Sequence, residues 1–398
     1  MVKTMKCEQL IIHTKLLEKL QEQEFKELTL IQEKCIPAII QGNDVVGQAE
    51  TGSGKTLAFC LPILNKIIPG RGLQALVLTP TRELCVQVTD VFRDFGKNLD
   101  IRSTSVYGGV SIGPQIRDIR SSEIVIGTPG RMLDHLRRRT IDLGAIKVLV
   151  LDETDKMFEM GFVDDVEEIM RYIPQQRQLL MFSATISEEV HRLARKHLKH
   201  PVIIKTQSYV DHKKLKQIYY DIYEQNQKFS LLVHLLNSNT DGLSIVFCGT
   251  RRESDAVSKN LARQGIRASA IHGGMKQQKR SSSLDALKTQ KTKVLVATDV
   301  AARGLDIKNV THIYNYDVPK TPTEYVHRIG RTARAGANGA AITLLTERDH
   351  DNFRRVQSND DFNIERADIP DFRKVPFMRW FEPRNHSYRG SPRHSFGR

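Results

Sequence analysis

Short runs of branched apolar residues recur along the chain, and each run ends in a turn before a helical pattern begins. The runs in the first half are NDVVGQ, QALVLTPT, EIVIGTPG, KVLVLDE and QLLMFSAT. After about Lys205 the rhythm restarts with LSIVFCGT, IRASAIHGG, TKVLVATD, THIYNYD and AAITLLT. Continuous apolar runs predict strands that are buried on both faces of a parallel sheet. We therefore expect two tandem α/β domains, each a mainly parallel sheet covered by helices.

The length of the chain also favours two domains. Single hydrophobic cores stop growing near roughly 250 to 300 residues, and this chain has 398. We expect domains over residues 1–205 and 217–370, with a polar, basic linker over residues 206–216. The closing segment, residues 371–398, is basic and lacks apolar periodicity, so it is expected to be disordered when unbound.

The net charge of the chain indicates the class of partner that it binds. A net charge of +14 predicts attraction to a polyanion such as nucleic acid, although a generally basic protein of another class would share it. No apolar run approaches the ~18 to 20 residues that span a bilayer, and the N-terminus lacks a continuous apolar stretch. We therefore expect a cytoplasmic protein with no membrane contact. Its single, scattered cysteines indicate reduced thiols rather than zinc ligands or disulfides; they are Cys7, Cys35, Cys60, Cys85 and Cys248.

The stretch QAETGSGKT lies between the first apolar run and a helical pattern, which is the context of a phosphate-binding loop. Gly52 and Gly54 allow successive backbone N–H groups to face an anion at the start of a helix. Lys55 would contact the β and γ phosphates, and Thr56 offers a hydroxyl ligand to Mg²⁺. Ala49 departs from the usual GxxxxGK[ST] pattern. A Gly-Ser turn with a solvated lysine is the alternative.

Three carboxylates follow the buried run in KVLVLDETD. Beside a phosphate loop, Asp152 is a candidate to hold Mg²⁺ through its water shell. Glu153 would accept a proton from the attacking water. Asp155 is expected to form hydrogen bonds. The alternative is that Asp152 only caps a helix that begins near Thr154.

Eight motifs occur in one order: AETGSGKT, PTREL, GG, TPGR, DETD, SAT, ATDVAARGLD and HRIGRTAR. Together they resemble the DEAD-box family of ATP-dependent RNA helicases in superfamily 2, over about residues 7–365. The resemblance implies two RecA-like domains that bind ATP and RNA across a cleft. It also implies ATP hydrolysis to ADP and phosphate, which drives local, sequence-independent unwinding or remodelling of RNA duplexes and RNA–protein complexes.

The resemblance implies roles at the nucleotide. Gln32 of FKELTLIQ would read the adenine edge, with Phe25 packed nearby. The catalytic set would be Lys55, Asp152, Glu153, Asp155, Arg331 and Arg334, with Thr56 and Asp152 at the metal. The nucleotide would also contact Ala49, Glu50, Thr51, Gly52, Ser53, Gly54, Lys55, Thr56 and Asp306. The residues that couple hydrolysis to strand separation would be Ser183, Ala184, Thr185 and His327.

The resemblance also implies an RNA path that contacts the backbone rather than the bases. It would be lined by Pro80, Thr81, Arg82, Gly108, Gly109, Thr128, Arg131, Thr250, Gly273, Gln277, Arg280 and Thr298. Small residues and backbone N–H groups suit phosphates and sugars, so no sequence preference is expected.

Three positions depart from the family pattern. Thr154 replaces Ala in DEAD, Leu28 replaces a frequent Pro, and Cys7 replaces an aromatic residue that stacks on adenine. A thiol cannot supply that aromatic face. Two rival functions stay open at this point. One is an ATP-locked RNA clamp that turns over rarely, and the other is a DNA translocase of the same superfamily.

Overall fold

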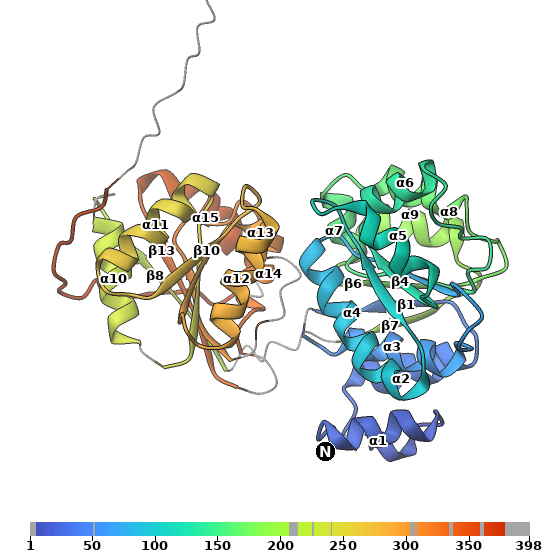
Figure 1. Ribbon diagram of the computed structural model, residues 1–398. Coiled ribbons are helices and arrows are strands. Elements are labelled where there is room, and N and C mark those ends of the chain that lie inside the picture. The colour runs from blue at the N-terminus through green and yellow to red at the C-terminus, as the bar shows by residue number, and fades with distance from the viewer. Residues whose placement is uncertain are drawn as a thin grey trace, which may run out of the picture.

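The computed structural model describes residues 5–50, 52–206, 214–224, 227–239, 241–302, 307, 309–333, 337–358 and 362–378. Two α/β bodies lie side by side in Figure 1, and each contains a sheet with helices on both of its faces. Within the described residues no helix is long and apolar enough to cross a membrane.

Domain 1 is built on a seven-stranded sheet in the order β3-β4-β2-β5-β6-β1-β7, and its strand pairs are parallel. The strands are β1 (Val45–Gln48), β2 (Ala75–Leu78), β3 (Ser103–Val106), β4 (Ile124–Gly127), β5 (Val148–Leu151), β6 (Gln178–Ser183) and β7 (Val202–Lys205). The central strands are buried along their whole length, as the continuous apolar runs predict.

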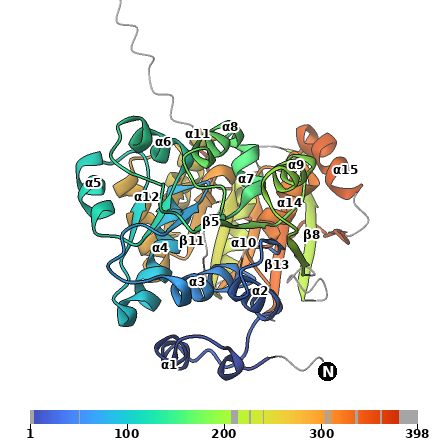
Figure 2. The same ribbon diagram turned by 90° about the vertical axis from the view of Figure 1, so that its right-hand side faces the viewer.

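Two separate cores lie on the two faces of this sheet. One contains Phe59 and Phe92, and the other contains Met132 and Ile169. The helices that supply them are α1 (Thr14–Glu22), α2 (Leu30–Ile40), α3 (Lys55–Lys66), α4 (Arg82–Gly96), α5 (Ile112–Arg120), α6 (Pro129–Arg137), α7 (Thr154–Glu159), α8 (Val163–Met170) and α9 (Glu188–His197). Two 3₁₀ turns, η1 (Cys7–Gln9) and η2 (Lys97–Leu99), complete the domain. Figure 2 shows α1 below the rest of domain 1.

Domain 2 repeats this plan with a parallel sheet in the order β10-β11-β9-β12-β13-β8-β14. Its strands are β8 (Leu215–Asp221), β9 (Leu243–Phe247), β10 (Ala268–Ile271), β11 (Val294–Ala297), β12 (Val310–Asn315), β13 (Gly339–Leu345) and β14 (Glu365–Arg366). Its helices are α10 (Lys228–Ser238), α11 (Arg251–Arg263), α12 (Gln277–Lys288), α13 (Asp299–Ala302), α14 (Pro322–Ile329) and α15 (His350–Gln357), with the 3₁₀ turn η4 (Glu347–Asp349). The expected pair of helix-covered parallel sheets is confirmed.

The expected linker extends too far at its C-terminal end. Leu215 and Lys216, placed in the linker by the sequence analysis, open strand β8 and pair with Gly339 and Ala340. Buried and more exposed residues alternate over the first four residues of β8, from Leu215 to Ile218. The basic residues around this short alternation made it look like linker. Residues 207–213 lie outside the described residues.

The expected disordered tail is also wrong at its start. Residues 371–378 lie against α10 and α11, and Phe372, Val375 and Phe377 pack on the core of domain 2. Val375 exchanges two hydrogen bonds with the Ser230 hydroxyl (3.0 and 3.3 Å). The backbone of Met378 does the same with the Asn260 amide (2.9 and 3.0 Å). An irregular strap of this kind has no sequence period, so its apolar residues could not be recognised as buried. The tail beyond residue 378 lies outside the described residues.

Phe377→Ala should lower the free energy of unfolding of domain 2 by about 2 kcal/mol, because its partly buried ring lies 5.0 Å from the ring of Phe229. Equilibrium denaturation of the whole chain measures this change, with Arg373→Ala on the same strap as the exposed control. Equal transitions for the two variants would mean that the strap does not stabilise the domain.

Candidate functional site

The strand order divides the carboxyl edge of domain 1 into two halves. Strands β3, β4 and β2 lead into the GG, TPGR and PTREL segments, and strands β5, β6 and β1 lead into DETD, SAT and the phosphate loop. Ligands of open parallel sheets bind beyond the carboxyl ends of the strands. The segments expected at RNA and those expected at the nucleotide therefore form two adjacent groups.

The lysine of the phosphate loop is hydrogen-bonded to the backbone of the same loop. Gly52 and Gly54 have φ values of 87° and 93°, the left-handed conformation that favours glycine. Gly54 is the N-cap of α3, so the positive end of that helix faces the loop. The Nζ atom of Lys55, which is 6% exposed, donates to the carbonyl of Ala49 at 2.8 Å. The loop is thus folded around a buried cation, although Thr51 lies outside the described residues.

Gln32 contacts the phosphate loop from α2. Its Nε2 donates to the Gly54 carbonyl at 3.1 Å, and its Oε1 accepts from the Thr29 N–H at 2.9 Å. A Cβ atom at Gly54 would lie 2.9 Å from the Thr29 hydroxyl and 2.5 Å from Gln32 Nε2. The φ of Gly54 therefore favours glycine, and any Cβ there would also force Gln32 or Thr29 to shift.

Phe25 and Cys7 lie together in another part of this region. Both line an open cavity of about 680 Å³ beside α1, and Phe25 is 37% exposed. Cys7 is 3% exposed and packs with Leu10 and Leu16 in the core, and burial raises the pKa of its thiol. Gln32 is not among the residues that line this cavity.

The carboxylates after β5 differ in their protonation. Burial, the largest cause, together with Glu153 and Asp155, raises the pKa of Asp152 to about 7, against the opposing charge of Lys55. Burial acts the same way on Asp155. There Lys55, the Thr185 N–H and other positive neighbours outweigh it and hold the pKa below its usual range. The Asp152 carboxyl can therefore exchange its proton for a cation, whereas the Asp155 carboxyl is already ionised.

Asp155 joins the SAT segment as the resemblance implies. Its Oδ2 accepts from the backbone N–H and the hydroxyl of Thr185 at 2.9 and 3.0 Å. The Ser183 hydroxyl accepts from the Asp155 N–H at 3.2 Å and donates to the Thr185 carbonyl at 2.7 Å. DETD and SAT therefore move together as one hydrogen-bonded unit.

Thr154 adds a further link at this place. Its hydroxyl is fully buried and lies 3.1 Å from the Leu151 carbonyl and 3.2 Å from the Phe182 carbonyl. These carbonyls belong to β5 and β6. The Thr154 hydroxyl is thus satisfied by the backbone of both strands.

The two domains present the same local arrangement at the expected RNA edge. Thr81 caps α4 and Thr250 caps α11, each by accepting a backbone N–H three residues on. The Arg82 guanidinium packs on Gly109, and the Arg251 guanidinium would lie 3.3 Å from a Cβ atom at Gly273. Thr128 likewise caps α6 without a side-chain hydrogen bond. Each edge therefore combines helix N-termini with small residues and an arginine.

Arg131 is held within domain 1. Its guanidinium donates to Gln115 Oε1 (3.2 Å) and to the Val110 carbonyl (3.1 Å), and its side chain is 12% exposed. The TPGR segment and the loop after GG are thereby fixed to each other.

The two domains contact each other directly. Glu83 of PTREL receives Arg280 Nε at 2.7 Å and Gln277 Nε2 at 3.3 Å. Lys156 Nζ lies 2.6 Å from His327 Nδ1 and 3.0 Å from both carboxylate oxygens of Glu159. Lys156 and Glu83, neither of them a predicted site residue, are therefore the domain 1 residues that make these two contacts.

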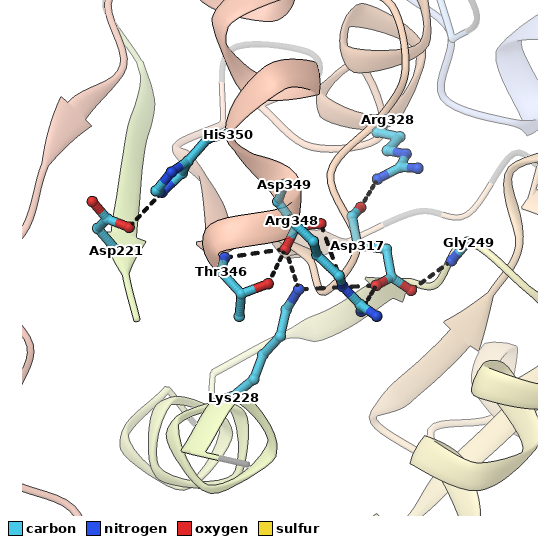
Figure 3. Close-up of polar contacts among 9 residues, drawn as sticks. All are labelled: Asp221, Lys228, Gly249, Asp317, Arg328, Thr346, Arg348, Asp349 and His350. Atoms are coloured by element: carbon cyan, nitrogen blue, oxygen red, sulfur yellow. Dashed lines mark hydrogen bonds and ion pairs between the residues drawn. The ribbon is translucent and has the colours of Figure 1, made fainter. Parts of the chain in front are cut away.

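The HRIGRTAR segment is connected to the RNA edge of domain 2. Arg328 pairs with Asp299 on α13 at 2.6 Å, and one of its N–H groups donates to the Asp317 carbonyl. Asp317 Oδ2 accepts from the Gly249 N–H at 2.8 Å, next to Thr250. Figure 3 shows the part of this network that runs from Arg328 through Asp317 to Gly249, together with the contact of buried Lys228 and Asp349, an ion pair at 2.9 Å.

Arg331 is 4% exposed and donates from Nε to the His327 carbonyl at 3.3 Å. Arg334 and Asp306 lie outside the described residues, so their roles stay predictions.

Comparison with known proteins decides the family. Residues 29–193 match the DEAD/DEAH box helicase family, and residues 227–336 match the helicase conserved C-terminal domain. The DEAD-box ATP-dependent RNA helicase RhpA of Helicobacter pylori is 44% identical over 356 residues, which cover 89% of this chain and 72% of RhpA. The ATP-dependent RNA helicase CshA of Listeria monocytogenes is 44% identical over 86% of this chain and 66% of CshA. The chain belongs to the DEAD-box helicase family.

Solved structures agree with the DEAD-box assignment. Dbp5 of S. cerevisiae, bound to RNA and ADP BeF3, superposes with a TM-score of 0.83 at 31% identity, covering 91% of this chain and 95% of that one. Mss116p, bound to ssRNA and AMP-PNP, has a TM-score of 0.81 at 27% identity and covers 93% and 81% of the two chains. The RecA-like character of both domains is thereby confirmed.

Lys156 and Glu83 show what motif matching misses in a DEAD-box chain. Each lies beside or inside a matched motif, but its partner comes from the other domain. A sequence displays a charge and not the residue that faces it. Only the inward position of Lys156 on α7, directly after DETD, could have suggested a role.

Asp152→Asn should change the pH dependence of stability in the metal-free and nucleotide-free protein. The folded protein retains the Asp152 proton up to about pH 7, whereas the unfolded chain releases it earlier. The contribution of Asp152 to the free energy of unfolding therefore falls as pH rises from the pKa of this group in the unfolded chain to its pKa in the folded protein. The fall is roughly 1.4 kcal/mol per unit of difference between these two pKa values at most. Denaturation at a series of pH values should show a smaller decline for Asp152→Asn. Parallel curves would contradict the raised pKa, and exposed Asp118→Asn is the control.

Arg280→Gln and Glu83→Gln should each open the contact between the domains, because each leaves one buried charge without its partner, a cost of ~3–5 kcal/mol. The double variant Glu83→Arg with Arg280→Glu, which exchanges the two charges, should restore part of the contact between the domains. Energy transfer between dyes on the two domains reports the closed fraction, with Lys279→Gln on the same helix as control. If all variants match the wild type, the pair does not hold the domains together.

Proposed function

We propose that this chain is an ATP-dependent RNA helicase, which hydrolyses ATP to ADP and phosphate and uses it to unwind or remodel RNA locally. One observation carries the proposal: the phosphate loop, SAT and DETD are joined at one edge of the sheet, by the Ala49 N–H to the Ser183 carbonyl (2.9 Å) and by Thr185 to Asp155. The pKa values of Asp152 and Asp155 are shifted in opposite directions there, which is typical of a catalytic site. The names of RhpA and CshA, and the ligands in the Dbp5 and Mss116p structures, support the same activity.

The residues fit a magnesium ion. Burial, followed by the charge of Glu153, raises the pKa of Asp152 against the opposing charge of Lys55, and a divalent cation at the end of β5 would oppose that rise further. Thr56 on α3 and Asp152 are the residues that would hold it, with oxygen donors of the kind Mg²⁺ prefers. When bound, Mg²⁺ neutralises charge on the phosphates. A Mg²⁺-bound site would favour the ionised form of Asp152.

The protein groups then divide the work of hydrolysis. Lys55 and the N-terminus of α3 bind the phosphate charge. Glu153 accepts a proton from the water that attacks the γ-phosphorus, and the bond between that phosphorus and the bridging oxygen breaks, so that ADP leaves with the bond electrons. Arg331 and Arg334 of domain 2 stabilise the transferred charge, which makes the reaction depend on contact between the domains.

RNA is proposed to lie along the other half of the edge. The capped helix starts at Thr81 and Thr250 and the small residues beside Arg82 suit a sugar–phosphate backbone, so binding is expected without sequence preference. Contact between the domains would bend one strand and separate a short duplex. We infer that Gln277 and Arg280, which contact Glu83, take part in this closure beside the proposed RNA path.

The proposal includes the division of the chain and its location. Residues 1–205 form the ATP-binding domain, and the second helicase domain begins at β8 and ends near residue 370, followed by the strap. We infer a cytoplasmic location from the composition.

An RNA clamp that turns over rarely uses the same residues, and it differs only in having little RNA-stimulated turnover. A DNA translocase differs in the nucleic acid that stimulates it.

The ATPase rate should be measured without nucleic acid, with RNA and with DNA of one sequence. RNA should stimulate the wild type most. Lys55→Ala should abolish binding and turnover, because the phosphates lose their charged partner. Glu153→Gln should keep ATP and RNA bound while turnover falls by ~10²-fold or more. Lys15→Ala, on exposed α1, is the control. Equal stimulation by RNA and DNA, or normal turnover in Glu153→Gln, would refute the assignment.

A further inference from the structure

Domain 1 carries an open cavity of about 490 Å³ where α5 and α6 end. Both helices begin at segments expected to contact RNA, since α5 follows GG and α6 starts within TPGR. The floor of the cavity is apolar and buried, and it is formed by Leu136, Ile141 and Leu143. A floor of this kind accepts a flat apolar face.

The rim of the cavity supplies charge and an aromatic ring. Arg120 and Arg139 are exposed, and in the described part of the chain neither has a carboxylate within ion-pair distance. The ring of Tyr172 is 49% exposed. Asp142 is the acid on the rim, and its Oδ1 accepts the Gly144 N–H at 2.8 Å. Two uncompensated guanidinium groups beside a tyrosine match a phosphate and a base.

Arg139 occupies a position where its side chain is not required for folding. Its φ is 55°, and its N–H donates to the Leu136 carbonyl (2.9 Å) just after the end of α6. The Thr140 N–H donates to the His135 carbonyl (3.0 Å), so the turn closes as a Schellman motif. Glycine is the usual residue there. Arg139 can therefore be replaced by glycine without strain.

A buried chain of hydrogen bonds joins the cavity to the RNA edge. Thr140, on the cavity wall, lies 2.8 Å from His135 Nδ1, and His135 Nε2 lies 3.2 Å from Gln115 Oε1. Gln115 receives Arg131 on the same oxygen (3.2 Å) and donates to the Tyr107 carbonyl, next to GG, at 3.0 Å. Burial, and then the charge of Arg131, lower the pKa of His135. The Gln115 amide oxygen only accepts, so His135 Nε2 donates to it, while the Thr140 hydroxyl lies within hydrogen-bond distance of both His135 Nδ1 and the His135 carbonyl (3.1 Å).

The distance from the RNA edge suits a continuing strand. Helix α6 has 9 residues, which is about 14 Å at ~1.5 Å per residue. A stacked strand advances ~3.4 Å per nucleotide, so about four nucleotides span that length. One RNA molecule can therefore contact both the edge and the cavity.

We propose that this cavity is a second RNA contact, which seats one unstacked nucleotide of the strand bound at the carboxyl edge of domain 1. This inference rests on the RNA binding proposed above. Tyr172 stacks on the base over the apolar floor, while Arg120 and Arg139 contact the flanking phosphates. The hydrogen-bond chain through His135 holds the cavity wall and the loops at GG and TPGR in a fixed relation.

The test compares RNA length in three oligonucleotides: one of about six nucleotides that fills the edge only, and two extended by about six nucleotides at the 5′ or the 3′ end. One extension should bind the wild type more tightly. Tyr172→Leu should lower the affinity for that extended RNA about tenfold. Arg120→Ala with Arg139→Gly should lower this affinity too and reduce the slope of log affinity against log salt by about 1.4, at ~0.7 per phosphate. Arg192→Ala with Arg195→Ala, on α9, removes the same charge elsewhere and is the matched control.

The outcomes separate this inference from the proposed function. ATPase stimulation by the short oligonucleotide should be unchanged in all variants, because that RNA does not reach the cavity. If the short RNA stimulates the wild type but the cavity variants bind the extended RNA like the control pair, the cavity does not take RNA and the inference is overturned. The same holds if neither extension adds affinity, which would leave a protein partner as the occupant. If the short RNA fails to stimulate the wild type, the proposed function itself fails.

Discussion

Everything at the active edge depends on one constraint: each sheet is parallel and is buried on both faces. Helices cover both faces, so the loops at the carboxyl ends of the strands are where a ligand can meet many segments at once. The acids after β5 follow a strand that is apolar and buried along its whole length. The acids after β5 are tolerated next to that core because Lys55 and the N–H groups of the SAT segment face them.

The order of the strands separates the nucleotide segments from the segments expected at RNA. In domain 1 the nucleotide segments follow three adjacent strands, and the segments expected at RNA follow the other three. Domain 2 places Gly273, Thr298 and Thr250 after β10, β11 and β9, in the same relative order. The contact of Asp155 with Thr185 joins two segments of the nucleotide half of domain 1. In domain 2, Arg328 and Asp317 connect the HRIGRTAR segment with Gly249, next to Thr250.

Much of this could be predicted from the sequence, and the reason is physical. Fully buried strands leave continuous apolar runs, and phosphate loops need glycine at fixed places, so the fold and the nucleotide motifs were visible. The strap over α10 was missed because irregular packing leaves no period. Leu215 was missed because β8 has an alternating pattern within a basic stretch. Partners such as Glu83 and Arg280 were missed because they meet only when two domains face each other.

The contact between Gln32 and Gly54 has a consequence for mutations of Gln32. The residue expected to recognise the base touches the loop expected to bind the phosphates, and a Cβ at Gly54 would displace Gln32 or Thr29. A mutation that altered the preference for the base through Gln32 would therefore also disturb the grip on the phosphates. Base recognition and phosphate binding are therefore linked through one hydrogen bond, and a change at Gln32 affects both.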